Sequence, residues 1–295
     1  MADDAQDTWT TDLREAEAAF RAARPRLFGI AYRILGSVSE ADDVLQEVWI
    51  RWQTYDRSGV RNAEAFLATT TTRLAINVLQ SARVRRESYV GPWLPEPVDT
   101  SADPALGAER GEALEVATLM LLERLTPTER ASYVLREAFD YPYDEIAEII
   151  GHSPASVRQL VSRARRHLAD ERRASVATAE HKRFLTAFVA AARAGNVAVL
   201  EELFAQDVIS YSDGGGAVRA SKIPVVGRER VAKYIRAFAG TFWTGVSVEP
   251  AEVNGLAAVR LSKDGTVFAV VTVTVSAQGI DRVWWMMNPA KIMAA

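Results

Sequence analysis

The sequence contains no cysteine, and this absence excludes several kinds of site at once. Disulfide bonds, thiolate zinc sites and thiol nucleophiles all require cysteine. Histidine is scarce as well: the chain has three, His152, His167 and His181, and they are too scattered along the sequence to indicate a metal site. We therefore expect neither a bound metal nor a cofactor.

Long apolar runs and a strong excess of one charge are also missing. No apolar stretch is long enough to cross a bilayer. The acidic start of the chain lacks the basic-then-apolar order of a secretory signal, so we expect a cytoplasmic protein that has no membrane partner. The formal net charge is only −3. Any binding of nucleic acid would therefore have to come from local clusters of lysine and arginine.

The 295 residues are more than a single domain of ordinary size usually holds, and the sequence pattern divides them into segments. Helical periodicity covers residues 12–90 and resumes over residues 112–175. Between them, residues 91–111 are rich in proline and small polar residues, which is typical of an extended linker. Residues 178–295 form the last segment. We expect two all-α helical modules followed by an α+β domain.

Within the last segment, two helices precede short runs rich in β-branched residues. The predicted strands cover residues 208–211, 246–248, 257–261, 266–275 and 280–285. The pairs Asn254-Gly255 and Asp264-Gly265 are strong hairpin signals. The pattern predicts a curved antiparallel sheet.

A helix-turn-helix within residues 143–166 is the strongest motif. Residues 144–150 predict a short helix with Ile146 and Ile150 facing inward, and Gly151 suits its end. Ser153 is a good N-cap for the second helix, and Pro154 suits its first position. An earlier capping box at residues 126–129 starts a helix that would cover the pair. The second helix has a buried stripe at Val157, Leu160, Val161, Ala164 and Leu168.

The opposite face of this second helix is rich in arginine and hydrogen-bonding residues. Glutamine and arginine can contact base edges in the major groove, while flanking arginines pair with phosphates. A solvated face on an ordinary bundle helix is the alternative, but the short helix, tight turn and capped second helix favour DNA. The contacts that we predict here are Ala155, Ser156, Arg158, Gln159, Ser162, Arg163, Arg165 and Arg166.

Two further predicted helices carry surfaces for partners. The helix over residues 39–52 has an apolar core face, but its other face places Ile50 among acidic and polar residues. An exposed isoleucine in such a setting suits a partner protein, although isolated exposed apolar residues are common. The helix over residues 62–86 ends in a basic cluster that would face a phosphate backbone, unless it serves only the helix dipole. The DNA contacts predicted along it are Arg73, Asn77, Gln80, Arg83, Arg85 and Arg86.

These helices resemble the sigma-70 family. Residues 41–52 resemble the polymerase-binding helix of region 2, and residues 65–77 resemble the promoter-melting segment. Residues 125–130 and 143–148 are similar to region 4. Because regions 1 and 3 are absent, the resemblance is to the extracytoplasmic-function (ECF) group, over about residues 24–173. The polymerase-binding residues that it implies are Asp42, Asp43, Gln46, Glu47, Ile50 and Arg51.

The resemblance implies an alternative sigma factor that binds core RNA polymerase and promoter DNA and is not an enzyme. Residues 12–90 would melt the −10 element, and residues 112–175 would contact the −35 element. Residues 89–97 are similar to the linker of an ECF subgroup with a fused SnoaL-like domain, a cone-shaped fold of the nuclear transport factor 2-like superfamily. Two short motifs of that domain correspond to residues 213–216 and 288–292.

In this subgroup the fused domain takes the place of a separate anti-sigma factor. The resemblance therefore implies intramolecular contacts that hold the free chain compact until polymerase binds. The chain departs from the subgroup at Ala290 and Ile292, where aspartate and leucine are common. The regulatory interface that it implies consists of Trp93, Leu94, Pro95, Glu96, Pro97, Asp213, Gly214, Gly215, Gly216, Asn288, Pro289 and Lys291.

Two other functions compete with this one. A conventional regulator with a ligand-sensing domain would bind DNA without polymerase. An isomerase or cyclase with a DNA-binding appendage would need a base, and without histidine or cysteine beyond His181 this would be a carboxylate, for instance Asp207 or Asp213. Asp213 is explained more simply as a turn residue before three glycines. Whether a small-molecule ligand exists stays open, because the aromatic and methionine residues that could line a pocket also suit a plain core: Trp243, Trp284, Trp285, Met286 and Met287.

Overall fold

The computed structural model describes residues 2–100, 115–169 and 176–292, and it divides into two compact units. The first unit contains described residues 2–84 and 121–169. The second contains residues 85–100, 115–120 and 176–292. The predicted linker residues 101–111 and both ends of the predicted 112–175 module lie outside the described residues.

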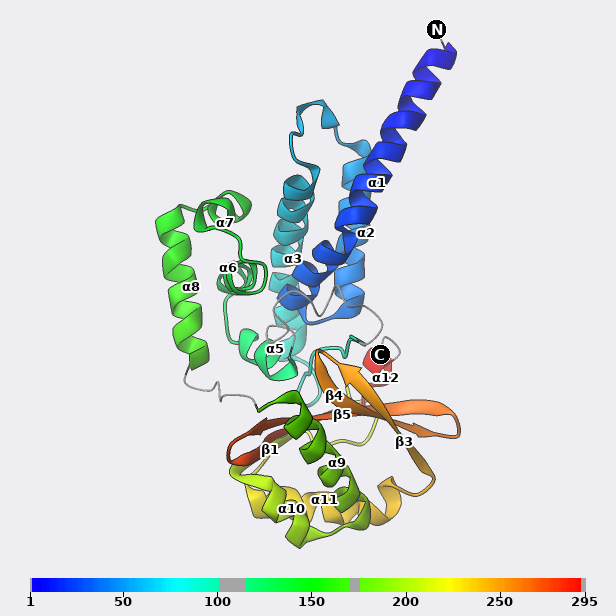
Figure 1. Cartoon of the computed structure of the whole chain (residues 1–295), viewed down its shortest axis with the longest axis vertical. Coiled ribbons are helices and arrows are strands. Elements are labelled where there is room, and N and C mark those ends of the chain that lie inside the picture. The colour runs from blue at the N-terminus through cyan, green and yellow to red at the C-terminus, as the bar shows by residue number, and fades with distance from the viewer. Residues whose placement is uncertain (1, 101–114, 170–175, 293–295) are drawn as a thin grey trace. The chain divides into compact units, whose positions relative to one another are not determined.

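The first unit begins with α1 (Ala2–Leu35), α2 (Val38–Thr54), the 3-10 turn η1 (Arg57–Gly59) and α3 (Ala63–Glu87), whose last turn belongs to the second unit (Figure 1). Ser37 caps α2 by accepting a hydrogen bond from the backbone N–H of Glu40 at 3.2 Å. The predicted core face of α2 is confirmed, with Trp49 half-buried against Phe20. Its buried residues are Ala41, Val44, Leu45, Val48 and Trp52.

The same unit contains the predicted helix-turn-helix. It consists of α7 (Tyr143–Ile150) and α8 (Pro154–Ala169), which follow α6 (Pro127–Glu137). The preceding helix, α5 (Val116–Leu122), belongs to the second unit up to Met120. The capping box that starts α6 is present, and Gly151 ends α7 with φ of 70° in the left-handed region. The backbone N–H of Ser156 donates to the Ser153 hydroxyl at 3.2 Å, which confirms the predicted N-cap.

One inward residue of α7 was predicted wrongly. Ile146 is buried as expected, but its buried partner is Ile149, whereas Ile150 is only half-buried. Spacings of three and four residues both lie on one side of a helix. In this two-turn helix, packing against α6 and α8 selects the spacing of three.

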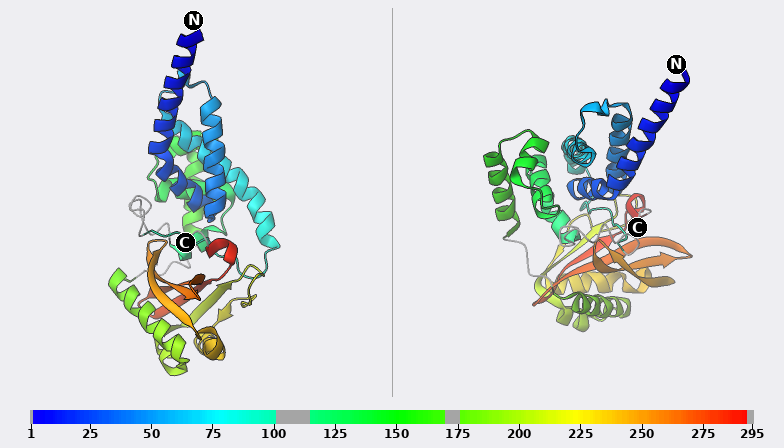
Figure 2. Two further views of the ribbon diagram at one scale, coloured as in Figure 1. Left: turned by 90° about the vertical axis from the view of Figure 1, so that its right-hand side faces the viewer. Right: turned by 45° about the horizontal axis from the view of Figure 1, so that its top comes forward.

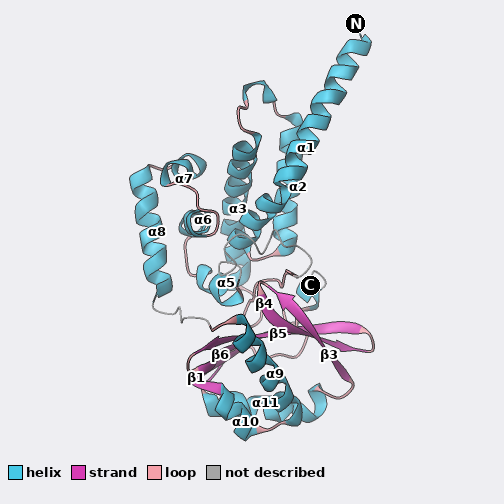
Figure 3. Cartoon of the chain, in the orientation of Figure 1, coloured by secondary structure: helices cyan, strands magenta, loops and turns pink. Residues whose placement is uncertain are grey.

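Strands occur only in the second unit among the described residues (Figure 3). Its helices are α9 (Thr178–Ala194), α10 (Val197–Leu203), α11 (Arg228–Phe242) and α12 (Pro289–Ile292). Its strands are β1 (Phe204–Asp213), β2 (Val225–Val226), β3 (Val246–Val253), β4 (Leu256–Lys263), β5 (Thr266–Ser276) and β6 (Gly279–Met286). The strand order is β2-β1-β6-β5-β4-β3.

The sheet is mixed, so the prediction of a purely antiparallel sheet was wrong. Strands β3 to β6 form an antiparallel meander, but β1 pairs with β6 in parallel. A parallel pair needs a long connection, and β2, α11 and strands β3 to β5 all lie between these two strands in the chain. The two hairpin predictions are confirmed. Asn254 and Gly255 have φ of 56° and 76°, and Asp264 and Gly265 have φ of 52° and 77°, the signs that a type I′ turn requires.

The two faces of this sheet have different covers. Helices α9, α10 and α11 lie together on one face (Figures 1 and 2). Side chains from alternate strand positions, such as Val271, Val273 and Trp285, form a core beneath them. The intervening positions, such as Val270 and Trp284, point to the other face and pack against Leu94. A segment of the predicted linker therefore covers this second face.

Candidate functional sites

The predicted DNA-binding face of α8 is exposed along its length, with Ser156 half-buried. Two of its arginines are oriented by acidic residues of α6. The guanidinium of Arg163 lies 3.3 Å from Glu129, and that of Arg165 lies 2.7 Å from Glu137. Because these pairs are solvent-exposed on the arginine side, each contributes about 0–1 kcal/mol. They orient the arginines without removing them from the surface.

Three predicted DNA contacts along α3 are bound to other parts of their own unit. Arg73 donates to the carbonyl oxygens of Ile149 and Glu148 at 2.7 and 2.9 Å, at the C-terminal end of α7. Carbonyls in the last turn of a helix lack intrahelical partners and favour a cation. Arg83 donates to the carbonyl of Leu125 at 3.3 Å, and in the second unit the Arg86 guanidinium lies 3.6 Å from the centre of the Trp93 ring. Asn77, Gln80 and Arg85 are exposed.

Two buried arginines link α1 to α6, and the sequence pattern gave no sign of them. Arg33 and Arg130 are at most 1% exposed. The Nε of Arg130 donates to the carbonyl of Arg33 at 3.2 Å, and its guanidinium pairs with Glu123. The Arg33 guanidinium lies 5.2 Å from the centre of the Phe139 ring. Buried charges need such partners, and these contacts fix the first helix against the start of the helix-turn-helix module.

The predicted polymerase-binding face of α2 is largely solvent-exposed. Ile50 is 48% exposed, as expected, and Asp43 and Gln46 are exposed beside it. Glu47 is half-buried and pairs with Arg51 at 2.7 Å. Asp42 pairs with Arg24 of α1 at 3.0 Å. The surface thus combines an apolar centre with charged neighbours.

A buried cluster, which we call the linker clamp, joins Tyr89 and Leu94, from the 89–97 segment that resembles the subgroup's linker, to Asp213, Asn288 and Lys291. Asp213 is 1% exposed and Lys291 is 6% exposed. The Lys291 ammonium lies 2.7 Å from the Asp213 carboxylate and donates to the carbonyl of Leu94 at 2.6 Å. The same carboxylate accepts from the Leu94 N–H at 2.9 Å. One ion pair therefore holds both polar groups of the Leu94 backbone.

The second oxygen of the Asp213 carboxylate binds a residue at the start of the linker. It accepts the Tyr89 hydroxyl at 2.5 Å and the Gly215 N–H at 3.1 Å. The Asn288 amide donates to the Tyr89 hydroxyl at 2.7 Å. Both oxygens of this buried carboxylate are thus fully used, which is the condition for keeping a charge inside a protein. The sequence pattern explained Asp213 as a turn residue. In the structure its carboxylate also holds Tyr89 and Leu94.

Burial and charge determine the electrostatics of the linker clamp. Burial lowers the pKa of the Lys291 ammonium, and the Asp213 carboxylate opposes this effect. Burial and the same carboxylate raise the pKa of the Tyr89 hydroxyl, which stays protonated and donates. The rings of Trp93 and Tyr89 lie 4.2 and 4.9 Å from the Lys291 nitrogen. Cation–π contacts of this kind partly replace the lost hydration.

Glycine is required at one position beside the linker clamp. Gly215 has φ of 58°, and a Cβ there would lie 2.4 Å from the Asn288 amide nitrogen. A side chain at this position would displace Asn288 from Tyr89. The close approach of Asn288 therefore explains the glycine at position 215, and the resemblance alone did not reveal this.

The linker remains attached to the sheet beyond the linker clamp. The Val98 N–H donates to the Asn254 side chain at 3.2 Å, and the Asn254 N–H donates to the Val98 carbonyl at 2.9 Å. Asp99 pairs with Arg260 at 2.5 Å. Of the residues implied for the regulatory interface, Pro95, Glu96 and Pro97 are buried, Trp93 is half-buried, and Gly216 and Pro289 are exposed. Sequence patterns missed Tyr89, Asn254 and Arg260 because their partners are distant in the chain.

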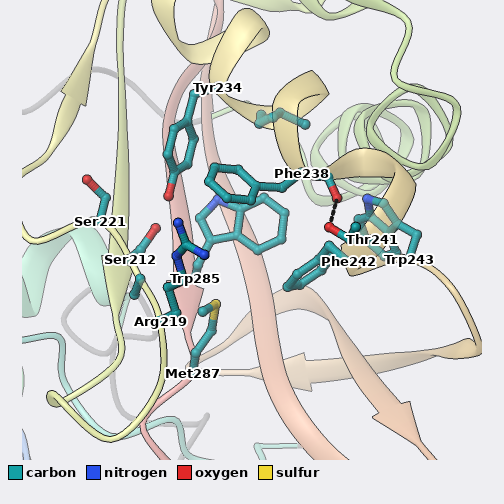
Figure 4. Close-up of a pocket in the computed structure, with 12 residues that line it drawn as sticks. Ser212, Arg219, Ser221, Tyr234, Phe238, Thr241, Phe242, Trp243, Trp285 and Met287 are labelled. Carbon is teal, nitrogen blue, oxygen red and sulfur yellow. Dashed lines mark hydrogen bonds between the residues drawn. The ribbon is translucent and has the colours of Figure 1, made fainter.

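A cavity of about 320 Å³ lies on the helix-covered side of the sheet (Figure 4). Of the five residues that could line a pocket, Trp243, Trp285 and Met287 line this one, whereas Trp284 and Met286 belong to the opposite face. Its lining contains no aspartate or glutamate, and the two carboxylates considered as bases, Asp207 and Asp213, lie outside it. Within the described residues, no group of three or more acidic or histidine side chains could hold a metal ion, and no helix is long and apolar enough to span a membrane.

Comparisons with known proteins agree with this architecture. The family profile "Sigma-70 region 2" matches residues 19–85, and "Sigma-70, region 4" matches residues 115–168. The chain is 32% identical over 286 residues to the ECF RNA polymerase sigma factor SigJ of Mycobacterium tuberculosis (strain ATCC 25618 / H37Rv), covering 92% of this chain and 91% of that protein. It is 31% identical to the probable ECF RNA polymerase sigma factor SigI of the same strain, covering 93% and 94%. The crystal structure of SigJ matches with a TM-score of 0.76 and 29% identity, over 94% of this chain and 98% of that one.

Proposed function

The chain belongs to the ECF RNA polymerase sigma factors, and we propose that its second unit regulates it through the linker clamp. Its role is that of an alternative sigma factor in transcription initiation, and its relatives are sigma factors rather than enzymes. In our proposal α2 binds core RNA polymerase, α3 contacts the −10 element and α8 contacts the −35 element. The three domains of this proposal keep the predicted bounds: residues 12–90 for region 2, residues 112–175 for region 4 and residues 178–295 for the regulatory domain. The linker covers residues 91–111.

The buried Asp213–Lys291 pair is the observation that carries the regulatory proposal. A polar segment that merely connects two domains has no need of a buried carboxylate and a buried ammonium. Here both groups are used to hold the backbone of Leu94 and the hydroxyl of Tyr89. Because the second unit is tethered to the linker, it binds at a high effective concentration, and a separate regulatory protein is not required.

The proposal describes two states of one chain. In the free chain the linker is held by the second unit, and the SnoaL-like domain acts in place of an anti-sigma factor. When polymerase binds, it takes up the linker or the promoter-contacting modules and shifts the population to the released state. The polymerase must bind the released state more tightly by at least the free energy that holds the linker.

Tyr89→Phe tests the proposal with little change in shape. The variant loses the hydroxyl that joins Asp213 to Asn288 but keeps the ring beside Lys291. We expect more run-off transcript per holoenzyme at limiting concentrations of the factor, because the restrained state loses stability. Tyr55→Phe, at an exposed tyrosine of the first unit, is the matched control. A transcript level equal to that of the wild type, with faster hydrogen exchange at the linker, would show that the linker clamp does not regulate.

A further inference from the structure

The cavity in the second unit has an aromatic wall. It lies between α11, the ends of β1 and β6, and residues 219–221 (Figure 4). Phe242 contacts Trp285 edge to face, with the ring centroids 5.7 Å apart, and Trp243 edge to face at 5.1 Å. Its volume of about 320 Å³ falls within the range of roughly 300–1,000 Å³ that small-molecule sites occupy. Rings arranged in this way favour a flat aromatic ligand.

Polar groups gather at one end of the same cavity. The side chains of Ser212, Arg219 and Tyr234 gather there, while Phe242 and Trp243 lie at the other end (Figure 4). Ser221 also lines the cavity, but its hydroxyl donates to the Ile223 carbonyl at 2.6 Å. Within the described part of the chain Arg219 forms no ion pair, and the cavity lining offers it no carboxylate. A cation beside the hydroxyls of Ser212 and Tyr234, at the end of an apolar cavity, suits an anionic oxygen group on a ligand.

The cavity and the linker clamp share two strands. Ser212 and Trp285 are paired neighbours in β1 and β6 and line the cavity, and the next residue of β1, Asp213, holds the linker on the opposite side. Met287 lines the cavity and donates its N–H to the Asp213 carbonyl at 2.8 Å. The residue after it, Asn288, contacts Tyr89. Neighbouring residues of a strand point to opposite faces. A ligand that contacts Ser212 and Met287 in the cavity therefore restrains the same backbone that positions Asp213 and Asn288 in the linker clamp.

We propose that this cavity binds a small aromatic molecule with one anionic oxygen group, such as an aryl carboxylate, and that the bound ligand strengthens the hold on the linker. The rings take up the aromatic part, and Arg219 with the hydroxyls takes up the carboxylate. Occupation limits the motion of the β1 and β6 ends, so Asp213 and Asn288 stay in the geometry that binds Leu94 and Tyr89. The regulatory meaning of this effect rests on the proposed function, but the binding itself does not.

Binding is tested by calorimetry on the purified full-length chain, with 2-naphthoate and its neutral analogue 2-naphthamide as probes. We expect 2-naphthoate to bind one site up to about fivefold more tightly than 2-naphthamide. Arg219→Gln should remove that difference, because an exposed cation contributes up to about fivefold to such a pair. The matched control is Arg230→Gln, at an exposed arginine outside the cavity lining. Thr241→Trp, at an exposed lining residue, should weaken both probes by filling the cavity.

The link to the linker is measured by hydrogen exchange of residues 89–98 with and without 2-naphthoate. We expect several-fold slower exchange at the Leu94 amide in the wild type, and a smaller slowing in Arg219→Gln at a probe concentration near the wild-type dissociation constant. Absence of naphthoate binding, or equal affinity for both probes, would overturn the ligand class. Tight binding with unchanged exchange at Leu94 would overturn the coupling. Because no polymerase is present, either failure would leave the transcription test of Tyr89→Phe unaffected.

Discussion

The arginine face of α8 and the linker clamp both depend on charged side chains, but they use charge in opposite ways. Arg163 and Arg165 keep about half of their side chains exposed and pair with acids at the surface. Lys291 and Asp213 are almost completely buried. A solvated arginine can exchange its acidic partner for a phosphate at small cost, whereas a buried pair resists separation. Exposed charge thus suits binding of a partner, and buried charge suits holding a segment in place.

This difference predicts a large effect of breaking the buried pair. Lys291→Met keeps the length of the side chain but leaves Asp213 buried without its cation, which costs about 3–5 kcal/mol. We expect the free energy of unfolding of the second unit to fall by this amount in urea titrations. The control is Lys263→Met at an exposed lysine, which should change it by less than about 0.5 kcal/mol. If the two variants were equally stable, the linker clamp would not be a strong restraint.

The exposed face should matter for DNA and little for stability. Arg163→Ala and Arg166→Ala should each weaken binding of holoenzyme to promoter DNA by about 1–3 kcal/mol, measured by fluorescence anisotropy. Arg193→Ala, at an exposed arginine of the second unit, is the control.

The opposite pattern is expected on α2, where Asp43→Ala or Gln46→Ala should lower affinity for core polymerase and leave promoter contacts intact. A single variant of either helix that lost both activities while still folded would contradict this division of labour.

A smaller effect should follow from breaking a surface pair. Arg165→Ala removes the contact with Glu137 and should lower the stability of the first unit by at most about 1 kcal/mol. Thermal unfolding of the variant at low and high salt measures this directly, because screening by salt should reduce even that difference. A loss as large as that of Lys291→Met would remove the distinction between the two charged regions.

The smallest expected effect on stability near neutral pH comes from His181. This buried residue of α9 places its Nε2 atom 2.8 Å from the Val273 carbonyl oxygen. Burial lowers the pKa of its imidazole below the ordinary value of 6.5. Below pH 6.5 the unfolded chain therefore binds a proton that the folded chain resists, and stability falls as pH decreases. His181→Gln should show a weaker dependence between pH 6.5 and pH 5 in urea titrations. An unchanged slope would show that His181 does not titrate in this way.

Sequence patterns predicted the helix-turn-helix better than the linker clamp for a physical reason. Caps, left-handed glycines and a helical stripe are local, so Ser153, Gly151 and Val157 could be placed from their neighbours alone. The clamp residues Leu94 and Lys291 are separated by almost 200 positions. No spacing predicts such a contact, and only the resemblance to a family suggested that the two motifs meet.

The sheet shows the same limit. Hairpins at Asn254 and Asp264 were predicted because the turn chemistry is local. The parallel pairing of β1 with β6 depends on how distant strands close the sheet, and so it was predicted wrongly. Helix α11 and strand β2 were missed. The buried arginines Arg33 and Arg130 were also missed, because an arginine pattern in a helix usually indicates an exposed face.

The absence of cysteine allows one direct test of regulation by the linker. An ideal Cβ at Gly216 lies 3.3 Å from the Cβ of Val90, close to the separation of about 3.5–4.5 Å that a disulfide spans. Val90→Cys with Gly216→Cys would therefore introduce a single disulfide between the 89–97 segment and the 213–216 motif, both within the second unit. Because φ of 75° at Gly216 strains a cysteine there, the reduced double variant is the reference for the oxidised one. We predict that the oxidised protein gives little run-off transcript with core polymerase and that dithiothreitol restores it. Equal transcription from the oxidised and reduced forms would contradict the central claim that the linker must be released.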